Sequence, residues 1–489
     1  MTQQIEIIIA LVIYFGICIG LGLYSMIKTR NADTHDYLTA GGNVSWVVNA
    51  VCIFAAFNSG GALMGNLGLA YNASAGYMNT LCAGTATGMF ISAMFVAGPL
   101  RNLRIATVPE FLRKRYNLKA LNIIAPVVLI CTITAYLMAQ MKVAGMLGEK
   151  ILGLPYEYGV LLIAVVYVFY TTVGGMFSVT LTDCFQGFIM LFVLTLACIF
   201  CVGEFGGFSA LYEVAAEARP SFISNQGMPW LTFVGGFMGW MFVNTCLPHS
   251  IMRVFTAKDE KSGRIALGVG ALLIGGFAVI ANTIIPAAGI VIHGGADLGE
   301  NTDYMFMDVI DAIFPQWFQA VVYAGVFAAV MSSVSGMLLS IGSAVSYDLI
   351  ETLRPNTDEK TVKKISMIAI VVFGAISAIL ALNPPALLTI LYSSAMGVLA
   401  SGLAAPLLLG LWWKRMNKWG ALAGLIGGAG LWIGLFLFSS LPSLAPSAFA
   451  VPVSFILCIV VSLMTPPSTE EELRRVSIAH ERMLTDEER

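Results

Sequence analysis

The chain has 489 residues, of which 58% are hydrophobic and only 11% are charged. A soluble globular protein carries about one-quarter charged residues, so this chain has too little charge to cover a surface that faces water. Its 26 lysines and arginines nearly balance its 28 aspartates and glutamates, which excludes a nucleic-acid-binding protein that works through a basic face. We therefore expect an integral membrane protein.

Long apolar runs follow one another along almost the whole sequence. A membrane-spanning helix needs about 20 mainly apolar residues, and the sequence predicts thirteen such helices in an all-α polytopic membrane protein. We expect a single transmembrane domain over residues 1–465 and a solvated cytoplasmic tail over 466–489. The predicted spans are 5–27, 44–71, 77–99, 120–148, 157–173, 178–202, 228–248, 265–293, 317–346, 365–382, 385–413, 420–438 and 449–464.

Basic residues gather on alternate connections between these spans. If the N-terminus lies outside, 23 of the 26 lysines and arginines, Arg253 among them, fall on the cytoplasmic side. The exceptions are Lys142, Lys150 and Arg219. Cytoplasmic connections carry an excess of lysine and arginine, so the pattern predicts an N-terminus outside and a C-terminus inside the plasma (bacterial cytoplasmic) membrane.

The second predicted span contains Asn58, Ser59, Gly60 and Gly61 near its middle. These are poor helix formers, and irregular backbone at membrane depth survives only where it is buried in protein or lines a cavity. Two interpretations stay open here. The small residues either allow close helix packing, or they mark a broken helix whose freed carbonyls bind an ion or a solute.

The predicted span at 228–248, five spans later, is interrupted in the same way by Gly235, Gly236 and Gly239. Interruptions at corresponding positions of two five-helix units indicate an inverted-repeat secondary transporter. We expect core units at about 44–202 and 228–413, with one span before them and two after them.

Two charged residues lie at membrane depth. Asp183 is inside the sixth predicted span, where a charge costs about 2.5–3.5 kcal/mol; it either reaches the interface or binds a cation. Lys142, in the outer half of the fourth span, either reaches the outer interface or anchors a carboxylate or pairs with a polar neighbour. His249 is expected at the cytoplasmic end of its span, as a structural residue at the interface. The stretch 107–116 (TVPEFLRKRY) predicts a short amphipathic helix on the cytoplasmic surface.

The ninth predicted span carries Ala329, Ser332, Ser333 and Ser335, most of which share one helix face. Each hydroxyl can bond a carbonyl of its own helix, which would make these packing residues. Alternatively, hydroxyls and freed carbonyls supply the hard, neutral oxygens that suit Na⁺.

Several stretches resemble signature sequences of the sodium:solute symporter family. They are 36–43 (DYLTAGGN), 109–116 (PEFLRKRY), 170–187 (YTTVGGMFSVTLTDCFQG), 247–253 (LPHSIMR) and 325–343 (GVFAAVMSSVSGMLLSIGS). The resemblance extends from the first span to about Met416. It implies a leucine-transporter-type 5+5 inverted-repeat fold and Na⁺ as the coupling ion. By the same resemblance, the carbonyls of Ala55, Asn58 and Ala329 and the hydroxyls of Ser332 and Ser333 would coordinate sodium.

The resemblance also concerns a second ion and the solute. Some members bind a second sodium through residues that match Asp183 and Ser335, but Gly336 replaces a further serine here. We therefore favour one sodium per cycle, with Asp183 and Ser335 on its exit path.

The solute would lie against the broken helix at mid-membrane. Candidate lining residues, chosen by depth and polarity, are Phe57, Ser59, Gly60, Tyr136, Gln140, Trp240, Asn244 and Tyr392.

The resemblance implies a sodium-coupled symporter that imports a small organic solute by alternating access. The stretches 247–253 and 382–422 look most like the pantothenate and monocarboxylate branches, so a small carboxylate is the first expectation. Proline or another amino acid, or a sodium-independent facilitator, is the alternative. We expect no enzyme, because no nucleophile–base pair lies at membrane depth. The expected partners are the solute, sodium and the lipid bilayer, without nucleic acid, and no obligate protein partner is evident.

Overall fold

The computed structural model describes residues 2–29, 39–103, 105, 107–225, 228–384, 388–442 and 444–481. Part of the motif at 36–43, the predicted start of a span at residue 385 and the end of the tail therefore lie outside the described residues. Within the described ranges the named elements are all helices, and the only extended pairing is an isolated bridge between Val44 and Ala257.

The helices have the following bounds. The first half of the chain forms α1 Thr2–Lys28, η1 Ala40–Gly42, α3 Trp46–Phe57, α4 Gly60–Asn72, α5 Ala75–Ile91, η2 Ser92–Val96, α6 Ala97–Asn102, α7 Val108–Tyr116, α8 Lys119–Leu152, α9 Tyr156–Glu204, α10 Phe208–Ala218 and α11 Ser221–Ser224. The second half forms α12 Trp230–Val243, α13 Pro248–Thr256, α14 Glu260–Leu273, η3 Ile274–Ala278, α15 Val279–Ile292, η4 Gly299–Tyr304, α16 Met305–Ile313, α17 Gln316–Ser343, η5 Ala344–Ile350, α18 Glu351–Leu353, α19 Glu359–Ala381, α20 Leu388–Trp412, α21 Lys418–Phe438, α22 Ser447–Met464, α23 Glu470–Arg474 and η6 Ser477–His480.

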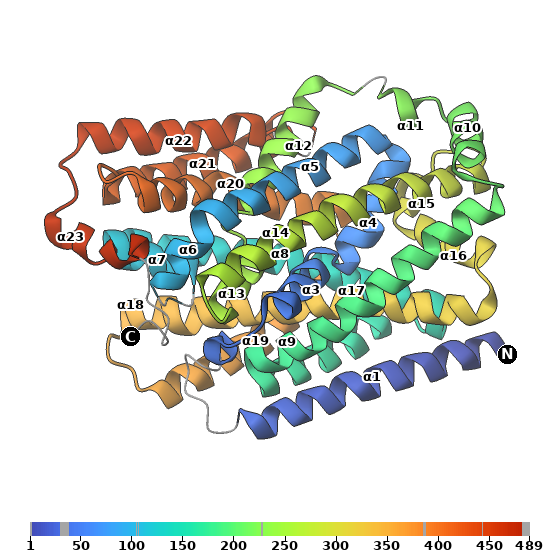
Figure 1. Ribbon diagram of the computed structural model, residues 1–489, viewed down its shortest axis with the longest axis horizontal. Coiled ribbons are helices and arrows are strands. Elements are labelled where there is room, and N and C mark those ends of the chain that lie inside the picture. Colours follow the sequence, from blue (N-terminus) through green and yellow to red (C-terminus); the bar gives the residue numbers. More distant parts are fainter. Residues whose placement is uncertain are drawn as a thin grey trace.

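The long helices run along a common direction and form one bundle (Figure 1). Several short helices lie at its two ends: α10, α11 and α16 at one end, and α7, α18 and α23 at the other. The most apolar stretch of α17 is completely buried, whereas that of α1 is only 28% buried. Helix α17 is therefore the central helix of the bundle, and α1 is a peripheral helix with a broad apolar outer face.

Eleven described helical segments are long and apolar enough to cross a membrane, and the bent pair α3–α4 makes a twelfth. The predicted span at 157–173 falls in the first part of α9, where the apolar segment Tyr156–Phe169 is shorter than the others. Helix α9 consists of two helices joined at Gly175, whose φ of 57° and ψ of −159° are not helical. The all-helical membrane fold is confirmed, and the number thirteen stays a prediction.

The two predicted helix breaks have different outcomes. Helices α3 and α4 meet at Asn58 and Ser59 with a bend of 57°, as a broken helix. In the later span the glycines do not break the helix, and that interpretation was wrong. Helix α12 continues through them and ends at Val243, and the interruption follows before Pro248. The glycines provide close packing instead, since a Cβ on Gly235 would lie 2.4 Å from the carbonyl oxygen of Leu444.

The predicted surface helix at 107–116 exists as α7, but it does not lie on the surface. Thr107 caps it by accepting a hydrogen bond from the Glu110 amide at 3.0 Å. The side chain of Arg115 is almost wholly buried, and its guanidinium donates to the carbonyls of Gly410 and Met416. The charge pattern misled the prediction because these backbone carbonyls, not water, solvate the cation.

The tail was expected to be solvated, but its described part packs against the bundle. The side chain of Asn102 donates hydrogen bonds to the carbonyls of Ala479 and Glu481. His480 Nε2 lies 2.8 Å from the carbonyl oxygen of Leu411, and its ring packs on Trp412. The segment from α23 to η6 therefore joins the ends of α6 and α20.

Candidate functional site

The break between α3 and α4 faces the central helix α17. The last four carbonyls of an α-helix have no partner within the helix, so the end of α3 offers free oxygens. Ser332 Oγ donates to the carbonyl of Ala55 at 3.0 Å and lies 3.1 Å from the carbonyl oxygen of Ala329. All three residues are buried. Two backbone oxygens from different helices thus meet at one hydroxyl.

Ser333 makes the neighbouring contact. Its hydroxyl lies 3.0 Å from the carbonyl oxygen of Ala56 and 3.3 Å from that of Ala329. Ala56 was not among the predicted residues, although it is adjacent to Ala55 in the same last turn. Asn58 ends α3, and its side-chain amide donates to the carbonyl of Phe54 at 3.1 Å. Together these residues form a buried group of neutral oxygens that suits a monovalent cation.

The start of α4 is held by side chains from α8. Ser59 caps α4 by accepting from the Ala62 amide, and its hydroxyl lies 2.9 Å from Tyr136 Oη. Gln140 donates to Ser59 Oγ and accepts from the Gly61 amide at 3.0 Å. The helix start is therefore fixed by two side chains that the sequence predicted to lie nearby.

Gly60 is required by the close approach of α4 to α17. A Cβ at this position would lie 2.1 Å from Val330 Cγ2, far inside van der Waals contact. Only a residue without a side chain allows the freed end of α3 to reach Ser332 and Ser333.

Four aromatic rings continue the cluster beyond the helix break. The ring of Phe57 lies 5.6 Å from that of Trp240, which lies 5.9 Å from that of Tyr392. The rings of Tyr392 and Tyr136 are 6.0 Å apart. These separations are typical of aromatic pairs in contact. The predicted solute-lining residues from α3, α8, α12 and α20 thus come together.

At the end of α12, two polar atoms of this cluster are buried and have no hydrogen-bond partner among the described residues. They are the Trp240 Nε1 donor and the Asn244 Oδ1 acceptor, which are four residues apart. Asn244 uses its amide nitrogen to bond the Trp240 carbonyl at 2.7 Å, which leaves its oxygen free. Buried polar groups are normally satisfied, so this donor and acceptor indicate a polar ligand.

Sequence reasoning missed two members of the cluster. Asn66 accepts a hydrogen bond from Tyr392 Oη. It lies seven residues after Ser59, and that spacing places both on one face of α4 and could have found it. His249 was expected at the interface, but it is 2% exposed and its ring lies 6.1 Å from that of Tyr136. That expectation was wrong because the break after α12 carries α13 into the core.

Asp183 has a partner that the sequence did not reveal. Its carboxylate forms a buried ion pair with Arg253 of α13, and Arg253 also donates to Thr180 Oγ1 at 3.1 Å. Arg253 was expected in a cytoplasmic connection, yet only 1% of its side chain is exposed. Ser335 Oγ lies 3.5 Å from Asp183, at the limit of a hydrogen bond. Asp183 and Ser335 are therefore next to one another, with the guanidinium held against the carboxylate.

Lys142 pairs with Asp303 at 2.8 Å, which decides between the two alternatives left open for it. Asp303 lies in η4 and also accepts from the Leu388 amide at 3.2 Å, at the start of α20. The pair thus connects α8, η4 and α20 on the side of the cluster away from Asp183.

A broken helix whose freed carbonyls face a central serine-bearing helix, beside a buried cluster of polar and aromatic groups, is the arrangement of a secondary transporter. The sequence pattern that defines the Sodium:solute symporter family matches residues 37–428. The chain belongs to this family. Sodium is accordingly its coupling ion, and the protein is a transporter of the plasma membrane, not an enzyme.

Curated relatives cover nearly the whole chain. The osmoregulated proline transporter OpuE of Bacillus subtilis (strain 168) is 29% identical over 479 residues, which are 95% of this chain and 96% of that protein. A sodium/proline symporter of Staphylococcus aureus (strain JH9) is 26% identical over 451 residues, covering 88% of this chain and 86% of the relative.

Solved structures show the same fold. A Na⁺-coupled sialic acid symporter in a substrate-bound, outward-open state superposes with a TM-score of 0.83 at 20% identity, covering 95% of this chain and 98% of that one. The transporter MhsT in complex with L-phenylalanine gives 0.55 at 14% identity, with 86% and 98% covered. At these identities the likeness concerns the fold alone.

Proposed function

We propose that this symporter imports proline together with sodium. The observation that carries the proposal is the free pair at the end of α12, where Trp240 Nε1 offers a donor and Asn244 Oδ1 an acceptor. A zwitterionic amino acid needs both, because its carboxylate accepts hydrogen bonds and its ammonium group donates them. The rings of Phe57, Trp240 and Tyr392 offer an apolar surface for the pyrrolidine ring. Two curated relatives are named as proline transporters, which supports the same solute.

The small carboxylate expected from the sequence fits this pair less well. A carboxylate without an N–H or O–H donor, such as pyruvate, would use the Trp240 donor and leave Asn244 Oδ1 buried without a partner. Such an unpaired group costs about 1–3 kcal/mol. Pantothenate carries hydroxyl and amide donors, but the cations Arg253 and Lys142, which could hold an anion, are paired with Asp183 and Asp303. We therefore place proline first and a monocarboxylate or pantothenate second.

For sodium we propose coordination by the carbonyls of Ala55, Asn58 and Ala329 and the hydroxyls of Ser332 and Ser333. The contacts of both serines with the end of α3 support this set. Sodium would join α3 to α17 and fix the helix break against which the solute lies. Because a ligand shifts an equilibrium only by its differential affinity, sodium and proline must each tighten the binding of the other.

We also propose thirteen spans with the N-terminus outside. The helices that precede and follow α9 both contact the connection after α15, which supports two crossings by α9. Lys150, at the end of α8, pairs with Asp311 at 3.0 Å. Ala218, at the end of α10, approaches so closely that a Cβ on Gly295 would lie 2.2 Å from the Ala218 carbonyl oxygen. Two core units at about 44–202 and 228–413 follow from this arrangement.

Uptake by proteoliposomes tests the solute. We expect an inward sodium gradient to drive accumulation of labelled proline, and unlabelled proline to compete better than pyruvate or pantothenate. Trp240→Phe keeps an aromatic ring, although a smaller one, and removes the donor, so it should raise the KM for proline about tenfold, the equivalent of 1.4 kcal/mol. Stronger competition by a carboxylate than by proline would refute proline as the solute.

The sodium set is tested separately in the same vesicles. Removing both hydroxyls with Ser332→Ala and Ser333→Ala should raise the sodium concentration for half-maximal uptake at least tenfold. Ser377→Ala removes a buried hydroxyl from α19 and serves as the matched control. An unchanged sodium dependence in the double variant would remove these serines from the site.

A further inference from the structure

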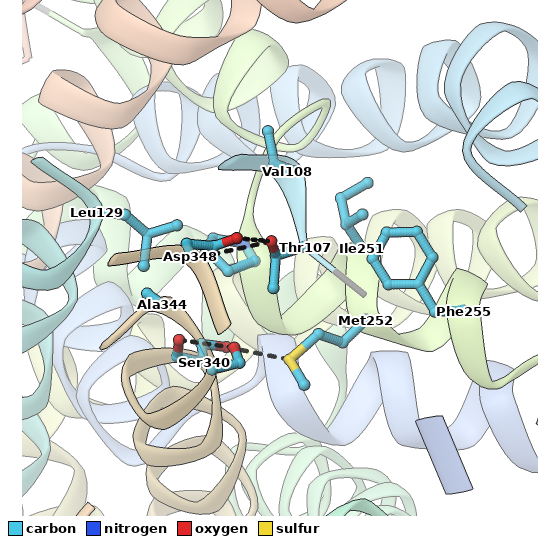
Figure 2. Close-up of a pocket in the computed structure, with 11 residues that line it drawn as sticks. Thr107, Val108, Leu129, Ile251, Met252, Phe255, Ser340, Ala344 and Asp348 are labelled. Carbon is cyan, nitrogen blue, oxygen red and sulfur yellow. Dashed lines mark hydrogen bonds between the residues drawn. The ribbon is translucent and has the colours of Figure 1, made fainter. Parts of the chain in front are cut away.

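A small cavity lies between α7, α8, α13 and the end of α17. Figure 2 shows Asp348 and Thr107 pointing toward one another in it, with Ser340 about two turns before Asp348 along α17 and η5. Ser343 also lines it, and apolar side chains of α8 and α13 close the other sides. The cavity is only large enough for about one water molecule or a bare monovalent cation.

Asp348 places a carboxylate in this cavity without a basic partner. The residue is 2% exposed, and Thr107 Oγ1 lies 2.8 and 2.9 Å from its two carboxylate oxygens. Arg113 is close, but its guanidinium donates to the carbonyl of Tyr347 at 3.0 Å and pairs with Glu351 at 3.0 Å. No ion pair among the described residues includes the Asp348 carboxylate. A buried carboxylate is costly unless it is paired or binds a cation.

The cavity adjoins the end of α17, the helix that carries the proposed sodium ligands Ser332 and Ser333. Asp348 follows Ser332 by sixteen residues, about 24 Å at 1.5 Å per residue. Half of the hydrocarbon core is about 15 Å thick, so an ion that leaves mid-membrane would meet Asp348 beyond this core, on the side that the charge pattern assigns to the cytoplasm. Asp348 also falls in the π-helical segment η5, a geometry often found at functional sites.

The oxygens around the cavity suit sodium. Ser340 and Ser343 lie between Ser332 and Asp348 along α17, and both hydroxyls bond carbonyls of that helix. Thr107 Oγ1 accepts from the Glu110 amide and thereby turns its hydrogen toward Asp348. A carboxylate and hydroxyls are hard oxygen ligands, which favour Na⁺ over softer metals.

We propose that Asp348, with Thr107, Ser340 and Ser343, forms a cation site that receives sodium on its way to the cytoplasm. This inference rests on sodium coupling but not on the identity of the solute. Sodium would replace the Thr107 hydrogen as the partner of the carboxylate, and the freed hydroxyl would turn a lone pair toward the ion. The site would lower the barrier to release, and sodium on the cytoplasmic face would occupy it and slow inward transport.

Inhibition by sodium on the predicted cytoplasmic face tests the site. In Asp348→Asn we expect the internal sodium concentration that halves uptake to rise at least fivefold, with the external sodium dependence unchanged within twofold. Asp348→Glu keeps the charge and should stay within twofold of the wild type, as should Asp358→Asn, an exposed carboxylate on the same side. Unchanged internal inhibition in Asp348→Asn would overturn the proposal. Thr107→Val removes a neutral ligand and leaves the carboxylate, so its effect should be smaller than that of Asp348→Asn. Equal effects would also overturn the proposal, because they are expected if the hydrogen bond between Thr107 and Asp348 only holds α7 against η5.

A labelling experiment covers the case in which Asp348→Asn does not fold. Ser343→Cys is introduced with Asp348 intact, in the Ser332→Ala/Ser333→Ala protein, so that binding at the proposed main site is removed. Because N-ethylmaleimide is larger than the cavity, it reaches Cys at position 343 only when transport opens the cavity to the cytoplasm, and sodium in the site should slow this alkylation at least threefold relative to choline. Equal rates in sodium and choline would refute the site. Absence of sodium-driven proline uptake by the wild type would instead refute the proposed solute and leave this result untouched.

Discussion

The pair between Arg253 and Asp183 shows how strongly a single buried charge depends on its partner. Both side chains are almost completely buried, and Thr180 adds a hydrogen bond to the guanidinium. Sequence reasoning identified Asp183 as a charge at membrane depth. It assigned Arg253 to a cytoplasmic connection, because the next basic residues are Lys258 and Lys261. The two residues are 70 positions apart, so no local pattern links them.

Replacing Arg253 by Gln should destabilise the protein strongly. The change leaves Asp183 buried without a cation, and breaking such a pair typically costs about 3–5 kcal/mol. We expect a clear fall in Tm in detergent, measured by thermal unfolding. The double variant Asp183→Asn/Arg253→Gln should recover most of the loss, since two neutral amides can bond one another. A single variant as stable as the wild type would show that the pair contributes nothing.

At the scale of elements, the approach of α4 to α17 positions the helix break against the serines. Gly60→Ala should push these helices apart, because the added Cβ would lie 2.1 Å from Val330 Cγ2. Overpacking of this kind costs about 1–3 kcal/mol. We expect a lower Tm together with weaker sodium dependence of uptake. Gly16→Ala in α1 is the control, since its Cβ meets nothing within 4 Å; equal effects of both variants would contradict this explanation.

Helix α19 gives a prediction for pH. Asp358 caps it, and the hydrogen bond with Thr361 lowers the pKa of the Asp358 carboxyl below its ordinary value of 3.8. A lowered pKa in the folded state stabilises the protein above the unfolded pKa, and this contribution disappears as the pH falls through the folded pKa. Wild type should therefore have a higher Tm than Asp358→Asn at pH 7, and the difference should shrink as the pH falls below 3.8 and through the folded-state pKa. A difference that does not change with pH would argue against a charged cap.

At the scale of the whole molecule, the number of crossings decides which surfaces face the same side. If α9 crosses twice, single cysteines in Glu157→Cys and Glu213→Cys should react with a membrane-impermeant maleimide from the outside. Lys360→Cys should react only from the inside. All three positions are exposed, and the unsubstituted protein gives the background from its own cysteines. If positions 157 and 213 are labelled from opposite sides of the membrane, α9 crosses it only once and the prediction of thirteen spans is wrong.

The sequence by itself determined the properties that depend on composition and local order. Scarce charge and long apolar runs required a helical membrane protein, because unpaired backbone groups are too costly in lipid. The poor helix formers at Asn58 and Ser59 located the first break, and the motifs identified the family. Depth and polarity selected the solute-lining residues beside that break, and the family resemblance selected the sodium residues; their roles as ligands stay predictions.

Tertiary structure alone decided which distant groups meet. The second break lies at Asn244 and not at the glycines, since packing against Leu444 occupies the space beside Gly235. The partners of Asp183 and Lys142, and the cavity at Asp348, were also decided there. The physical reason is the same in each case: a buried charge or a helix end must be satisfied by whatever group the fold brings within about 3 Å, and sequence distance does not record that approach.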